Sequence, residues 1–78
     1  MEPKTIQQLL LDALTFANKT LTPKEFDSIN RDKISYRVSG ETDMLEYYGE
    51  SFTIQSYVYS DKTRQTIILA HGQSYWAN

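Results

Sequence analysis

The residues best suited to catalysis lie near the end of the chain, in the segment AHGQSYW at positions 70–76. This segment holds the only histidine, His71, followed closely by Ser74. A histidine titrates near neutral pH and can act as the general base for a hydroxyl nucleophile. Such catalysis also needs an orienting acid, an oxyanion hole and a cleft that excludes water, and the sequence fixes none of these. We therefore interpret His71 as a polar strand end and expect that the protein is not an enzyme.

The sequence contains no standard metal or cofactor motif. Because the chain has no cysteine, thiolate zinc sites are excluded. The acidic segment ETDMLEYYGE, residues 41–50, lacks the spacing of a calcium loop, so we interpret it as a solvated hairpin tip. Its residues Glu46 and Glu50 are suited to facing a basic partner. The three glycines are isolated from one another, which excludes a glycine-rich phosphate loop, and we expect no cofactor.

Aromatic residues offer contact surface in place of reaction chemistry. The chain has six tyrosines, three phenylalanines and one tryptophan. Tyrosine and tryptophan are enriched where proteins bind proteins. We predict a protein-binding site composed of Tyr47, Tyr57, Tyr59, Tyr75, Trp76, Glu46 and Glu50. A purely structural interpretation stays open, because aromatic residues also favour strands and pair across them.

Two helices are expected before any of these residues. Apolar side chains recur every three or four positions over 4–18, which is typical of one helical face. The segment LTPKEF then carries a capping box of Thr22 and Glu25, with Pro23 at the first helical position. This signal predicts a second helix over 23–31. The short linker favours either an αα-hairpin or a steep crossing of the two helices.

Beyond the helices the pattern changes to alternation of apolar and polar residues, which predicts strands at 33–39, 44–48, 51–60 and 65–71. Turns are expected at SGETD, at the pair Gly49 and Glu50, and at DKTR. After His71 we expect a glycine exit and a tail. In that tail Tyr75 and Trp76 either fold back on the sheet or contact a partner.

This order of elements predicts an α+β fold, with two N-terminal helices packed on one face of a four-stranded antiparallel β-meander. We expect one small domain over residues 1–78. Side chains of the third strand divide into two sets. One set should meet the helices and consists of Phe52, Ile54 and Val58. The other should form an outward band of Thr53, Gln55, Tyr57 and Tyr59, which Tyr47 and Ile68 join if the strand registers allow it.

Charge and composition limit the partners. The net charge is −2, which disfavours generic nucleic-acid binding because such binding depends on cationic side chains. A small stacking platform of tyrosines with Lys33, Arg37, Lys62 and Arg64 stays an alternative. The first residues contain neither a basic leader nor an apolar run long enough to span a bilayer. With no cysteine present, we expect a cytoplasmic protein that does not bind membranes.

The sequence therefore favours a small protein-binding module, an inhibitor or adaptor of a larger protein. In size and character the chain is similar to the small proteins that phages encode to block host enzymes and defence systems, including anti-CRISPR proteins. This similarity is one of class, rests on no motif and transfers no residue. Two alternatives stay open: a nucleic-acid-binding regulator that uses the sheet face, and a small structural homodimer without catalytic activity.

Overall fold

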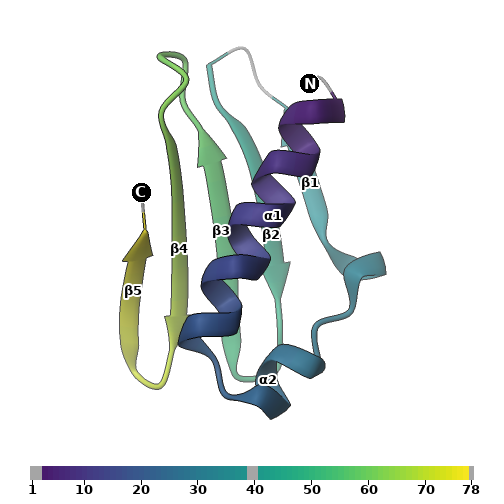
Figure 1. The fold of residues 1–78 in the computed structure, drawn as a ribbon, viewed down its shortest axis with the longest axis vertical. Helices are drawn as coiled ribbons and strands as arrows, with labels where there is room; N and C mark the ends of the chain where they lie inside the picture. The colour runs from purple at the N-terminus through teal and green to yellow at the C-terminus, as the bar shows by residue number, and fades with distance from the viewer. Residues whose placement is uncertain (1–2, 39–40, 78) are drawn as a thin grey trace.

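The computed structural model describes residues 3–38 and 41–77 and consists of one helix layer on one antiparallel sheet (Figure 1). The helices are α1 (Pro3–Thr20) and α2 (Pro23–Asp27), followed by the short 3₁₀ helix η1 (Arg31–Lys33). The strands are β1 (Ser35–Val38), β2 (Asp43–Tyr48), β3 (Phe52–Val58), β4 (Arg64–Ala70) and β5 (Gln73–Ala77). Each strand pairs with the next along the chain. The predicted α+β fold with an antiparallel meander is confirmed, with five strands in place of four.

Helix α1 runs diagonally across β2, β3 and β4 (Figure 1). The side chains that it buries against the sheet, Leu9, Ala13 and Ala17, recur every four residues. Two of the three are alanines, whose small side chains let the helix axis lie close to the strands. Leu21 continues the same buried row beyond the end of the helix. This contact fixes which face of the sheet the helix layer covers.

The capping box predicted at the start of α2 is present. The Glu25 backbone N–H donates to Thr22 Oγ1 over 3.2 Å, and the Thr22 N–H donates to Glu25 Oε1 over 2.9 Å. The predicted end at residue 31 is wrong, because α2 stops at Asp27. The side chain of Asn30 accepts a hydrogen bond from the Asp32 N–H and starts η1 instead. In Figure 1, α2 lies across the end of the sheet, beside the C-terminal end of α1.

The strand registers place a compact core between the sheet and α1. Leu45, Ile54 and Ile68 come from three adjacent strands and are at most 2% exposed. The same face holds one buried polar pair, in which the hydroxyls of Ser56 and Thr66 lie 2.8 Å apart. One hydroxyl donates to the other, so neither of these buried groups lacks a partner.

The tail predicted after His71 is a fifth strand, β5. Ala70 pairs with Gln73, so His71 and Gly72 form a two-residue hairpin loop. Their φ values of 56° and 73° are both in the left-handed region, as a type I′ turn requires. The strand β4 therefore ends at Ala70, one residue before its predicted end, and His71 occupies the first central position of the turn.

The β2–β3 turn is also displaced from its predicted position. The Gly49 N–H donates to the Phe52 carbonyl over 2.9 Å, so the central residues are Glu50 and Ser51. Gly49 is required for a different reason: a Cβ there would come 2.7 Å from Phe52 Cζ. The turn predicted at DKTR is confirmed, with Lys62 at a φ of 70°. The predicted turn SGETD falls partly on residues 39–40, which lie outside the described residues.

Candidate functional site: the uncovered face of the sheet

Helix α1 covers one side of the sheet and α2 lies at its end (Figure 1). The opposite side, here called the outer face, carries no helix of the described chain. Residues directly opposite one another in an antiparallel pair share a face. The strand registers therefore assign alternate residues of each strand to the outer face. They are Ser35, Arg37, Met44, Glu46, Tyr48, Thr53, Gln55, Tyr57, Gln65, Ile67, Leu69, Ser74 and Trp76.

Large apolar side chains gather on the β4–β5 part of the outer face. Trp76 stands opposite Ile67 and is 59% exposed. Leu69 lies on the same face one pair further along β4 and is 41% exposed. A folded protein seldom leaves a tryptophan open to water beside aliphatic neighbours unless the patch contacts something else. Because these residues stand on paired strands, their backbone is held in place before any partner binds.

A buried carboxylate lies on the same face in β2, separated from this patch by β3. Glu46 is only 9% exposed although it stands on the outer face. Its Oε2 accepts hydrogen bonds from the Tyr48 hydroxyl at 2.5 Å and from Gln55 Nε2 at 3.2 Å. Its Oε1 lies 3.6 Å from the Arg37 guanidinium, which is largely exposed. The hydrogen bond to Glu46 raises the pKa of Tyr48 above its ordinary value, since it favours the protonated phenol.

The network continues toward the β3–β4 turn. The Tyr57 hydroxyl donates to Gln55 Oε1 over 2.8 Å, and the Tyr59 hydroxyl donates to Gln65 Oε1 over 2.9 Å. The rings of Tyr57 and Tyr59 stack with centroids 6.0 Å apart. Burial raises the pKa of the Tyr57 phenol. The placement of both tyrosines on the outward side agrees with the sequence prediction, with Tyr57 half-buried.

Tyr47 and Glu46 lie elsewhere than expected, whereas Tyr75 folds back on the sheet, one of its two expected placements. Tyr47 is on the helix side and only 6% exposed, and its hydroxyl accepts a hydrogen bond from the Asn30 N–H. Its assignment to the outward band is wrong, and so is that of Ile68, which is fully buried. Tyr75 also faces the helix layer and packs against the core. Glu46 belongs to the middle of β2 and not to a solvated hairpin tip, whereas Glu50 is exposed in the β2–β3 turn.

His71 reaches across to the helix layer. Its Nε2 lies 3.0 and 3.1 Å from the two carboxylate oxygens of Glu25, and its Nδ1 lies 3.5 Å from the Tyr75 hydroxyl. Ser51 donates to the same carboxylate over 3.3 Å. Hydrogen bonding from the Thr22 backbone, followed by that from His71, lowers the pKa of Glu25 to about 2. This arrangement ties a turn to a helix cap.

Ser74 stands on the outer face, on the opposite side of β5 from Tyr75, and so is directed away from the helix layer that His71 contacts. His71 and Ser74 both line an open hollow at the end of the sheet, but no hydrogen bond joins them in the described part of the chain. Among residues 3–38 and 41–77, no three histidine or acidic side chains come close enough together to hold a metal ion. None of the helices in the described part of the chain has the length and apolar character needed to cross a membrane.

The basic residues suggested for nucleic-acid stacking do not share a face. Arg37 stands on the outer face, whereas Arg64 is on the helix side, with its Nε 2.8 Å from Asp12 Oδ2 on α1. Lys33 belongs to η1, and Lys62 to the β3–β4 turn. Comparison of the chain with protein-family models, curated proteins and solved structures gave no match.

Proposed function

We propose that this protein is a small binding module that docks a larger protein against the outer face of its sheet, as an inhibitor or adaptor. The observation that supports this proposal is the exposure of Tyr48, Leu69 and Trp76, at 66%, 41% and 59%, on the sheet face that no described helix covers. Interfaces commonly place aromatic and aliphatic anchors near their centre, with polar groups at the rim.

The chemistry of the outer face supports contact with protein. Glu46 already has partners for its carboxylate, so covering it with another molecule leaves no unpaired buried charge. Trp76 supplies a large rigid anchor, because its backbone is paired in β5. The size of the chain supports the class of phage-encoded inhibitors that block host enzymes or defence systems, and its lack of cysteine supports a cytoplasmic location.

The proposal is tested by affinity capture from a lysate of the source cells, with wild-type protein beside a Tyr48→Ala/Trp76→Ala variant. A matched control is Tyr36→Ala: Tyr36 is 42% exposed but lies opposite Leu45, on the helix side of the edge strand β1. We expect one larger protein to be retained by wild type and by the control, and lost from the outer-face variant. Retention by all three proteins would contradict the proposal, as would capture of only a second copy of the chain.

A further inference from the structure

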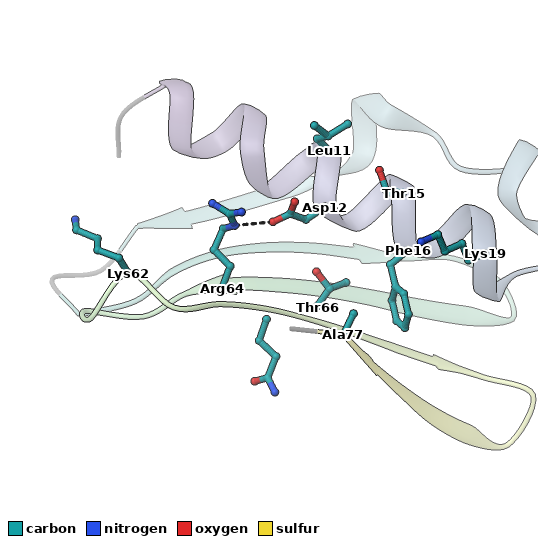
Figure 2. Close-up of a pocket in the computed structure, with 10 residues that line it drawn as sticks. Leu11, Asp12, Thr15, Phe16, Lys19, Lys62, Arg64, Thr66 and Ala77 are labelled. Atoms are coloured by element: carbon teal, nitrogen blue, oxygen red, sulfur yellow. Dashed lines mark ion pairs between the residues drawn. The ribbon is translucent and has the colours of Figure 1, made fainter.

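A groove on the helix side of the molecule runs between α1 and the β4–β5 edge (Figure 2). Its volume is about 550 Å³, within the range of pockets that hold ligands. Thr15 and Phe16 of α1 form one wall, and Thr66 and Ala77, which pair across β4 and β5, form the other. The groove lies mainly on the helix side of these strands and meets the outer face at Gln65, which also lines it.

The charges that line the groove are unbalanced. They come from Lys19, Lys62, Arg64 and Asp12. The single carboxylate, Asp12, is already engaged, because its Oδ2 lies 2.8 Å from Arg64 Nε (Figure 2). Within the described part of the chain, neither Lys19 nor Lys62 forms an ion pair. An excess of positive charge in one groove of a chain with a net charge of −2 favours an anionic ligand.

The groove also has apolar surface between its lysines. Leu11 is 59% exposed at its lip, and Phe16 is half-buried in its wall. The α1 residues that line the groove extend from Leu11 to Lys19. Lys62 lies beyond this stretch, because it also lines a hollow with Gln8, about one helical turn earlier on α1. At 1.5 Å of rise per residue the distance from Gln8 to Lys19 is roughly 17 Å, the length of about five residues of extended chain. An occupant therefore needs apolar side chains as well as negative charge.

We propose that this groove binds a short acidic peptide segment of another protein, with its carboxylates at Lys19 and Lys62 and its apolar side chains on Leu11 and Phe16. A second contact of this kind goes beyond docking at the outer face and does not depend on it. A partner that engages both surfaces gains from the high effective concentration of its second contact.

The test uses a fluorescein-labelled, end-capped peptide of sequence Asp-Leu-Glu-Leu-Asp, with Asn-Leu-Gln-Leu-Asn as the uncharged counterpart. The groove variant is Lys19→Glu/Lys62→Asn, where asparagine is chosen because residue 62 has a φ of 70°. The matched control is Lys24→Glu/Lys33→Asn, which changes the same charges at the α2 end of the molecule. Circular dichroism verifies that every variant is folded.

We expect fluorescence anisotropy to show that wild type binds the acidic peptide. The affinity for this peptide should fall about tenfold or more in the groove variant, because repulsion replaces attraction at the groove. In the control variant the affinity should stay within about twofold of wild type. Amide shifts in NMR spectra should map to α1 and the first half of β4. Equal binding of the uncharged peptide, an unaffected groove variant, or no binding of the acidic peptide would overturn the proposal. Tighter, lysine-dependent binding of oligothymidylate would also overturn it and assign the groove to nucleic acid.

Discussion

The imidazole of His71 lies 3.0 Å from the carboxylate of Glu25, a residue 46 positions earlier in the chain. This pair joins the β4–β5 turn to the cap of α2, so the only histidine of the chain fastens the final hairpin to the helix layer. Because β5 carries Trp76 on its other side, the same contact helps to hold the outer face in place.

The contacts of Glu25 with Thr22 and His71 predict that the stability of the protein depends on pH in the acid range. The pKa of Glu25 is lowered from 4.5 to about 2 by the Thr22 backbone N–H and then by His71. A carboxyl group whose pKa falls on folding stabilises the protein above the unfolded pKa, and this stabilisation disappears as the pH falls to the folded pKa. The difference in unfolding free energy between wild type and Glu25→Gln should therefore shrink between about pH 4.5 and about pH 2. Urea unfolding at a series of pH values measures it, and a difference independent of pH would contradict the link.

The left-handed turn predicts that the loss of stability depends on which residue replaces Gly72. A Cβ at this position meets no atom within 4 Å, so the cost of a side chain there is conformational and not steric. Gly72→Ala should destabilise the protein by about 1 kcal/mol, the usual penalty for a non-glycine residue in this region. Gly72→Asn should cost less, because asparagine tolerates the left-handed conformation. Thermal unfolding that ranked the two substitutions in the opposite order would argue against the type I′ turn.

The buried hydroxyl pair predicts that the effects of substituting Ser56 and Thr66 on stability are strongly non-additive. Ser56→Ala alone leaves the Thr66 hydroxyl without its partner in the core and should cost roughly 1–3 kcal/mol. Adding Thr66→Val removes that unpaired group at nearly constant shape, so the double variant should be as stable as Ser56→Ala or more stable. A double-mutant cycle from chemical denaturation measures the coupling. Simple additivity of the two substitutions would mean that the hydroxyls do not interact.

The carboxylate of Glu46 on the outer face predicts a change in the pKa of Tyr48 when that carboxylate is removed. Glu46→Gln removes the acceptor charge that raises the pKa of Tyr48, so that pKa should move down toward its ordinary value. NMR titration of the tyrosine ring signals follows this change, with Tyr48→Phe to assign the resonance. An unchanged Tyr48 titration in the variant would show that the hydrogen bond between the two side chains does not form in solution.

The sequence predicted the elements whose signals are local. The periodic apolar residues of α1 and the capping box at Thr22 and Glu25 depend on neighbours within one or two helical turns, and both are present. The alternation in β3 likewise divided its side chains correctly between the two faces, because Ile54 lies in the core and Tyr57 does not.

The parts that escaped prediction depend on contacts distant in sequence. In β2 the consecutive residues Leu45, Glu46 and Tyr47 are all buried. Because buried and exposed residues do not alternate here, a pattern of apolar and polar residues could not show which face each side chain occupies. Glu46 accepts a hydrogen bond from Gln55 of the neighbouring strand, a pairing that only the strand register shows. The strand β5 was missed because its turn has histidine where type I′ turns favour asparagine.

Trp76 offers the most direct test of the proposal that the outer face binds a larger protein. It is the only tryptophan, so protein made with fluorotryptophan carries a single fluorine reporter on that face. When the captured partner is added, we predict a saturable shift of the fluorine resonance and loss of its sensitivity to exchange of water for heavy water. A resonance that keeps its free position and solvent sensitivity, while size-exclusion chromatography shows that the complex has formed, would contradict the proposed docking face.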